Sequence, residues 1–153
     1  KKLSIEILGK NEVLGVLLRG TDYVNLRPKN HPVQPTLQEA IEKIDLILRE
    51  KGYQKIYIAT EDKEIFQKIS EKYGAKLVFM DVERYITINK ENINDISIKK
   101  SADKYKIGKD YLINIILLSR CDYIIAGNTS GSQGALLIRH KFNNKYFFNL
   151  GNY

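Results

Sequence analysis

The sequence has little of several residue types that define common classes of protein. It has one cysteine, Cys121, so neither an internal disulfide nor a cysteine-rich zinc site can form. Its two histidines, His31 and His140, are too few for a multi-histidine metal centre. No apolar run approaches the roughly 18 residues that span a bilayer, and no secretory signal is visible. We therefore expect a globular chain with no bound metal and no membrane span.

What the sequence does contain is typical of one folded domain. It has 153 residues, of which 43% are hydrophobic and 28% charged. The 25 basic and 18 acidic residues give a net charge of +7, which favours an anionic partner such as a nucleotide, a nucleic acid or an acidic membrane surface. An ordinary solvated, lysine-rich surface is the alternative. Because the chain begins with Lys1-Lys2 rather than with Met, we expect it to be either a trimmed chain or a piece of a longer protein.

Short apolar runs alternate with amphipathic stretches along the chain. We expect strands at residues 13–18, 56–59, 76–80, 123–126 and 145–148, and a less distinct strand at Leu3–Leu8. We expect helices at residues 36–52, 61–74, 110–118 and 131–139. This alternation predicts an α/β fold, namely a Rossmann-like, doubly wound, mainly parallel sheet with helices on both faces. Residues 81–107 show no clear pattern, which is typical of a functional or mobile segment.

Two of the expected helices carry distinct signals. Thr36 and Glu39 have the spacing of a capping box, and Gly52 is placed to end the same helix. The stretch Asp110–Leu118 is apolar nearly all round, so we expect this helix to pack inside a larger body.

Polar residues follow three of the expected strands at their carboxyl ends. Arg19 and Gly20 follow the first strand, Thr60–Asp62 the second, and Asn128–Gln133 the fourth. Open parallel sheets bind ligands outside the carboxyl ends of their strands. We therefore expect a binding site at this edge of the sheet.

The segment after the fourth strand is typical of an anion site at the start of a helix. The first amides of a helix lack internal partners and lie at the positive end of its dipole. Thr129, Ser130 and Ser132 add hydroxyl donors, and Gly131 lets a phosphate approach closely. An ordinary Ser/Thr helix cap is the alternative interpretation.

Arg19 ends an apolar strand, where a guanidinium needs an anionic partner. That partner is either a diphosphate, held by a bidentate clamp, or Asp22 in an internal pair. Gly20 permits a sharp turn of the backbone, and Tyr23 either stacks on a ring or packs against the protein.

Further polar groups have candidate roles at the same edge. Thr60, Glu61 and Asp62 either accept hydrogen bonds from a ribose or a base, or cap the following helix. His31 lies in a loop with three prolines and is either an acid–base or acceptor-side group or an incidental surface residue.

Three segments together resemble the motifs of a fucosyltransferase family that includes α-1,6-, α-1,2- and protein O-fucosyltransferases. They are Gly15–Tyr23, Ile56–Asp62, and Leu117–Tyr123 followed by Thr129–Ser132. Their order and spacing agree with the family from residue 13 to residue 134. This combined agreement is far more specific than any one of the motifs.

The resemblance implies that residues 1–153 form the donor-binding, Rossmann-like half of a GT-B glycosyltransferase. The implied reaction is a metal-independent, inverting transfer of fucose from GDP-fucose to a glycan acceptor during synthesis of a surface polysaccharide. No cofactor is implied beyond this donor, and the sequence contains no Asp-x-Asp pair. The implied acceptor-binding half lies N-terminal to this piece, which need not be active alone. The implied location is cytoplasmic or peripheral to a membrane, with no nucleic acid as partner.

The resemblance also implies roles for individual residues. Arg19 corresponds to an essential arginine on the donor diphosphate, the serines of the third motif to contacts of the β-phosphate, and Asn114 to an aspartate that reads guanine. Leu17 and Gly20 stand where the family often has a histidine and a second arginine. These differences leave open a glycosyltransferase that uses another nucleotide sugar. The residues by themselves also leave open a non-catalytic module that binds a nucleotide or a nucleic acid.

Overall fold

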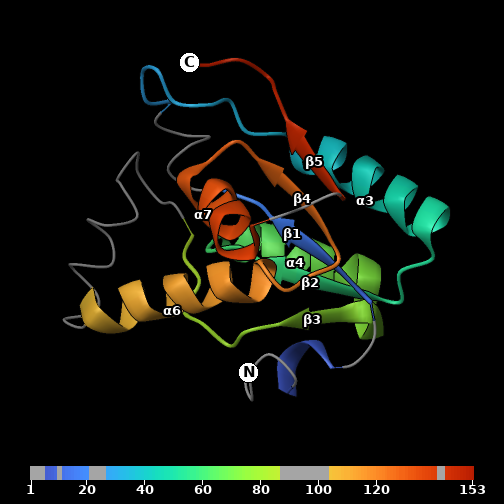
Figure 1. Cartoon of the computed structure of the whole chain (residues 1–153). Coiled ribbons are helices and arrows are strands. Elements are labelled where there is room, and N and C mark those ends of the chain that lie inside the picture. The colour runs from blue at the N-terminus through green and yellow to red at the C-terminus, as the bar shows by residue number, and fades with distance from the viewer. Residues whose placement is uncertain (1–5, 10–11, 21–26, 87–103, 141–143) are drawn as a thin grey trace.

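The computed structural model describes residues 6–9, 12–20, 27–86, 104–140 and 144–153, and these residues form one sheet with helices on both sides. All strand pairs in the sheet are parallel, and the strand order is β3-β2-β1-β4-β5 (Figure 1). The strands are β1 (Val13–Leu17), β2 (Lys55–Ala59), β3 (Leu77–Phe79), β4 (Tyr123–Gly127) and β5 (Lys145–Phe148). The predicted α/β, doubly wound fold is confirmed.

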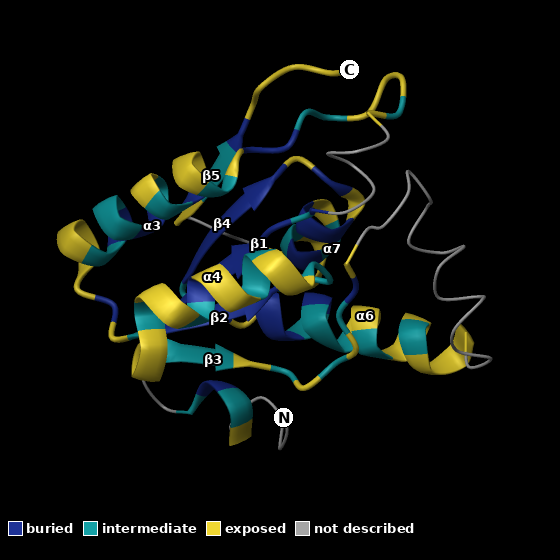
Figure 2. Ribbon diagram, turned by 180° about the vertical axis from the view of Figure 1, so that it is seen from behind, coloured by how far each residue is buried: buried dark blue, intermediate teal, exposed yellow. Residues whose placement is uncertain are grey.

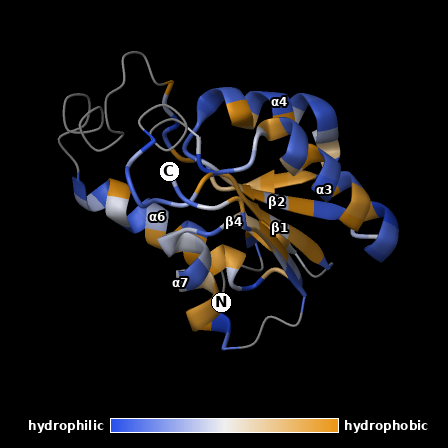
Figure 3. Ribbon diagram, turned by 90° about the horizontal axis from the view of Figure 1, so that it is seen from above, coloured by the Kyte–Doolittle hydropathy of each residue, from blue (hydrophilic) through white to orange (hydrophobic). Residues whose placement is uncertain are grey.

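The two faces of the sheet are covered by different helices. Figure 3 shows α3 (Leu37–Lys51) and α4 (Lys63–Tyr73) on one side of the sheet, and α6 (Lys104–Leu118) and α7 (Ser130–Arg139) on the other. A short 3-10 turn, η1 (Gly74–Lys76), joins α4 to β3.

The central strands are buried because helices cover both faces. In β1, Val13 and Leu17 join the hydrophobic core beneath α6 and α7, whereas Leu14 and Val16 join the core beneath α3 and α4. Every residue of β1 and β4 is buried (Figure 2). This explains why both strands are apolar without the alternation of a half-exposed strand.

The order of the strands places a topological switch point between β1 and β4. From β1 the chain passes to β2 and β3 on one side, and then returns to β4 and β5 on the other. Leu17 at the end of β1 lies opposite Ala59 of β2 and Ala126 of β4. The segments that follow these three strands therefore leave the sheet side by side, which is where open α/β sheets bind ligands.

The helix boundaries follow local chemistry. The predicted capping box is present, since the Thr36 hydroxyl accepts a hydrogen bond from the Glu39 amide and the Glu39 carboxylate accepts one from the Thr36 amide. Hydrogen bonds donated to the Glu39 carboxylate by the Thr36 hydroxyl and by the Thr36 amide hold the pKa of Glu39 below its usual value. Gly52 ends α3 at φ +73°, a conformation that favours glycine.

Two expectations differ from the structure. The described part of the expected strand at Leu3–Leu8 is helical at Glu6–Leu8, and Leu8 is buried against the core beneath α6 and α7. Helix α6 begins at Lys104 and is not enclosed, because Leu112 is 55% exposed. Only the last turns of α6 meet the sheet, so apolar composition alone overestimated its burial.

No helix among the described segments is long and apolar enough to cross a membrane.

Cys121 packs where β1 has no side chain. A Cβ at Gly15 would lie 2.9 Å from both Cβ and Sγ of Cys121. Burial raises the pKa of the Cys121 thiol far above its usual value. We therefore predict that Cys121 does not react with Ellman's reagent at pH 8 in the folded protein and reacts fully in denaturant. Rapid labelling without denaturant would contradict this packing.

A groove of about 510 Å³ lies between the C-terminal ends of α3 and α4. Its lining residues are Asp45, Leu48, Arg49, Lys72, Tyr73 and Lys76. Asp45 already pairs with Lys72 at 3.1 Å and accepts a hydrogen bond from the Tyr73 hydroxyl at 2.9 Å. Helices of a parallel α/β fold end at the amino edge of the sheet, so this groove is far from the carboxyl edge where the polar residues converge.

Candidate functional site

Arg19 leaves the central strand of the sheet at the carboxyl edge. Its Nε lies 3.1 Å from Oε1 of Glu61, which follows β2, and the two side chains are only 17% and 19% exposed. The internal partner considered from the sequence, Asp22, lies outside the described residues, as does Tyr23. A guanidinium carries five N–H donors in a planar fork, so it can hold Glu61 and a second anion together.

The carboxyl end of β2 is organised around the cap of α4. The Thr60 hydroxyl accepts a hydrogen bond from the Asp62 amide at 3.2 Å, and Asp62 Oδ1 accepts one from the Ile65 amide at 2.9 Å. A Cβ on Gly20 would lie 2.7 Å from Cβ and Cγ of Asp62. The space beside Gly20 is therefore filled by Asp62, and an arginine at position 20 would displace this cap.

Tyr85 joins the site from the segment after β3, and no pattern of residues around it predicts this contact. Its amide donates to the Glu61 carbonyl at 2.8 Å, and its carbonyl accepts from the Lys63 amide at 3.0 Å. These two bonds fasten the backbone at Glu61 and Lys63, on either side of Asp62. The Tyr85 side chain is buried, which raises the pKa of its phenol.

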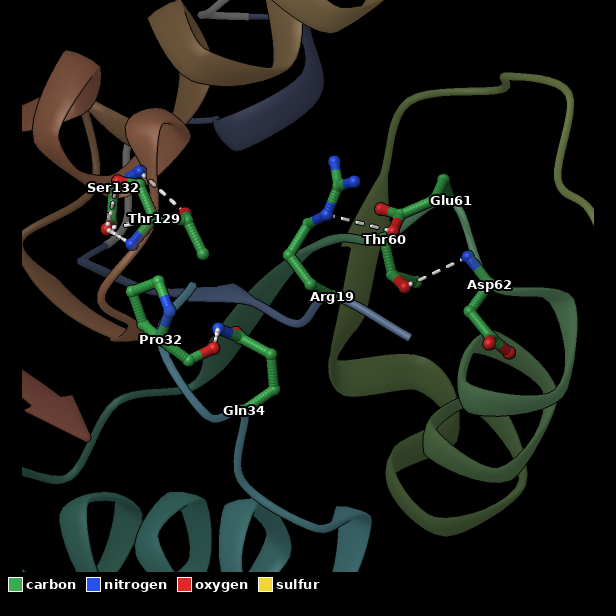
Figure 4. A network of polar contacts seen from close by, with 8 residues as sticks. All are labelled: Arg19, Pro32, Gln34, Thr60, Glu61, Asp62, Thr129 and Ser132. Atoms are coloured by element: carbon green, nitrogen blue, oxygen red, sulfur yellow. Dashed lines mark hydrogen bonds and ion pairs between the residues drawn. The ribbon is translucent and has the colours of Figure 1, made fainter. Parts of the chain in front are cut away.

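Two of the three hydroxyls at the start of α7 form hydrogen bonds within the protein. The Ser132 hydroxyl lies 2.8 Å from the Gly127 carbonyl and 2.9 Å from the Thr129 carbonyl, and it accepts a hydrogen bond from the Thr129 amide (Figure 4). Ser132 is fully buried and Thr129 is 7% exposed, whereas Ser130 is exposed. Capping, the alternative interpretation, is thus present for the Thr129 and Ser132 hydroxyls, and their contact with a ligand remains a prediction. Ser130 supplies the hydroxyl that faces solvent.

The amides of the same turn divide in a similar way. The Ser132 amide donates to the Thr129 hydroxyl at 3.3 Å, and the Gln133 amide donates to the Thr129 carbonyl at 3.0 Å. Helix geometry leaves the amides of Ser130 and Gly131 as the donors available to a ligand. They lie at the positive end of the helix, where an anion is favoured.

Gly131 is buried, and the space that a side chain would occupy there is filled by other side chains of the protein. This space is therefore not an open path for phosphate. A Cβ there would lie 2.8 Å from the Tyr111 hydroxyl and 3.0 Å from Cδ1 of Ile115, both in α6. The glycine therefore allows α6 and α7 to approach closely. Gly131 stands out in the sequence as part of a Ser-Gly-Ser turn, whereas no local signal marks its spatial neighbour Tyr111.

Asn114 lies on the side of the sheet covered by α6 and is already engaged. Its Oδ1 accepts a hydrogen bond from the Tyr57 hydroxyl at 2.6 Å, and its Nδ2 donates to the Asp110 carbonyl at 2.9 Å. Burial raises the pKa of Tyr57 well above its usual value, so the phenol stays protonated and remains a donor. A contact between Asn114 and a base edge remains a prediction. Asn114 would have to make it with the same side-chain atoms that form these two hydrogen bonds.

The loop that carries His31 is held by the C-terminal tail. The Asn30 amide donates to the Tyr153 carbonyl at 3.0 Å, and the Tyr153 amide donates to the His31 carbonyl at 3.0 Å. The His31 ring is exposed, and its Nδ1 lies 3.1 Å from the Lys29 carbonyl. His31 is thus at the surface of this loop, and its acid–base role remains a prediction.

Gln34 fastens the same loop to the end of β4. It is 5% exposed, and its Nε2 donates to the Pro32 carbonyl at 2.9 Å. A Cβ on Gly127 would lie 2.9 Å from Cδ of Gln34, so the amide packs directly over the backbone that leads into α7. Figure 4 shows Gln34 together with Arg19 and the capping residues of α7.

The chain thus has a Rossmann-like fold of the kind found in fucosyltransferases, as two solved structures show. Fucosyltransferase NodZ from Bradyrhizobium superposes with a TM-score of 0.55 at 16% identity over 99% of this chain. POFUT1 in complex with GDP superposes with a TM-score of 0.59 at 13% identity over 96% of this chain. This chain spans 42% and 45% of the lengths of these two proteins. These structures confirm the fucosyltransferase-like fold that the resemblance implied.

The comparisons with sequences give no match. No family model matches this chain, and neither does any curated protein.

Proposed function

We propose that this chain is the donor-binding part of a glycosyltransferase that takes a nucleoside diphosphate sugar, GDP-fucose, and transfers the sugar to a glycan acceptor. The observation that carries the proposal is the arrival of Arg19 and the first turn of α7 from adjacent parallel strands at one edge of the sheet. Both are suited to phosphate, the first through its guanidinium and the second through unpaired helix amides. The likeness to a POFUT1 structure that contains GDP supports the same interpretation.

The proposed chemistry is an inverting displacement that needs no metal. An acceptor hydroxyl attacks the anomeric carbon of the sugar and passes its proton to a general base, the bond to the diphosphate breaks, and negative charge develops on the leaving diphosphate. Arg19 and the amides of Ser130 and Gly131 stabilise that charge, because they are donors fixed in position before the reaction. The acceptor-binding half belongs to a longer chain, and surface polysaccharide assembly at the cytoplasmic side of a membrane is the proposed setting.

The test is a thermal-shift panel of nucleoside diphosphates on this chain. GDP at 100 times its dissociation constant adds about 2.7 kcal/mol to the free energy of unfolding, which for a domain of this size raises Tm by roughly 5–11 °C. We predict a saturable shift with GDP that UDP, CDP and guanosine do not match.

Each other outcome has a definite meaning. A larger shift with UDP than with GDP would keep the glycosyltransferase and replace GDP-fucose as the donor. No shift with any nucleoside diphosphate, together with salt-dependent binding of single-stranded nucleic acid, would favour a nucleic-acid module and contradict the proposal.

A further inference from the structure

Tyr111 places a phenol hydroxyl beside the turn proposed to bind phosphate. The hydroxyl lies 2.8 Å from the position that a Cβ of Gly131 would occupy. On a helix the Cα–Cβ bond tilts toward the N-terminus, so a group at this position lies beside the first turn. The Tyr111 hydroxyl is therefore at the side of the first turn of α7, on the residue whose amide is proposed to bind phosphate.

Few hydroxyls at the start of α7 face a ligand, so a hydroxyl from Tyr111 can add to phosphate binding. Those of Thr129 and Ser132 form the cap, so the exposed hydroxyl that the helix offers a ligand is that of Ser130, beside the two amides. Tyr111 is 45% exposed, so a ligand at this edge can reach its side chain. Arg19 comes to the same edge from β1, and the site does not depend on the end of α7 alone.

We propose that Tyr111 is a further donor-binding residue whose hydroxyl donates a hydrogen bond to the phosphate held at the first turn of α7. This inference rests on the proposed function. It gives Gly131 a role in addition to packing, because any side chain there would displace the phenol from the turn. A neutral hydroxyl adds a directed donor next to the positive end of the helix without a further charge.

The test compares Tyr111→Phe with Tyr105→Phe, a matched variant at a 79% exposed tyrosine in the first turn of the same helix. Binding of GDP, UDP and guanosine is measured by calorimetry for both variants and for the wild type. Tyr111→Phe removes one oxygen and keeps the ring, so we expect an unchanged Tm and about 10-fold weaker binding of the preferred diphosphate, as for loss of a hydrogen bond to a charged group. Tyr105→Phe is expected to bind like the wild type.

The nucleoside separates a phosphate contact from a base contact. If Tyr111→Phe weakens guanosine as much as GDP, the hydroxyl does not act on phosphate and the inference is wrong. If the wild type binds GDP, Arg19→Ala loses that binding and Tyr111→Phe retains it, the inference fails while the proposed function stands. If the wild type binds neither diphosphate, both are overturned.

Discussion

Arg19→Ala is expected to slow sugar transfer by about 10²–10³-fold in a chain that includes the acceptor-binding half, the usual effect of removing one fixed donor to developing negative charge. The structure gives the physical reason. Arg19 is held by Glu61 at 3.1 Å and is largely shielded from water, so its charge acts on a bound diphosphate with little screening. In this chain alone the same variant is expected to abolish the thermal shift produced by GDP.

The control for Arg19→Ala is Lys72→Ala. Lys72 also forms an ion pair at 3.1 Å, with Asp45, but it lies in the groove between α3 and α4. We expect Lys72→Ala to bind GDP like the wild type. If Arg19→Ala retained transfer within tenfold of the wild type, with circular dichroism showing an intact fold, Arg19 would be only the structural partner of Glu61.

Ser132→Ala is expected to lower the free energy of unfolding by about 1–3 kcal/mol, the range for leaving buried polar groups unsatisfied. The Ser132 side chain is fully buried, and its removal leaves the Thr129 amide and the Gly127 carbonyl without their partner. For a domain of this size the loss corresponds to a fall in Tm of roughly 2–12 °C. Urea unfolding monitored by circular dichroism measures it.

Ser130→Ala is the matched variant, two residues earlier in the same turn. Ser130 is exposed, so its loss is expected to change the free energy of unfolding by less than about 0.5 kcal/mol. It should instead weaken GDP binding, because the exposed Ser130 hydroxyl is the one proposed to contact the diphosphate. The reverse pattern, a stable Ser132→Ala with weak GDP binding and an unstable Ser130→Ala, would contradict the assignment of capping to one serine and ligand contact to the other.

The sheet and its helices could be predicted from the sequence because their signals are local. Continuous apolar runs such as Val13–Leu17 indicate strands covered on both faces. The capping box at Thr36 and Glu39 and the glycine at position 52 fix the ends of α3 through bonds within a few residues. The alternation of strands and helices then predicts the parallel order, and with it the edge where Arg19 and Ser130 emerge.

Contacts between distant segments could not be predicted in the same way. The partner of Arg19 is Glu61, 42 residues away along the chain, and this pairing depends on β1 and β2 being neighbours. Burial of the Ser132 hydroxyl depends on how the chain turns from β4 into α7. The sequence of this turn does not show which of its serines faces inward and which faces outward. The exposure of α6 depends on how far it extends beyond the sheet, which its apolar composition does not reveal.

Titration of ¹⁵N-labelled protein with GDP tests most directly whether one diphosphate is shared by the strand end and the helix start. The backbone amides of Ser130 and Gly131 and the Nε–H of Arg19 are expected to shift together, along one saturation curve. Shifts concentrated on Arg49, Lys72 and Lys76 in the groove between α3 and α4, with Ser130, Gly131 and Arg19 unchanged, would contradict the proposed site.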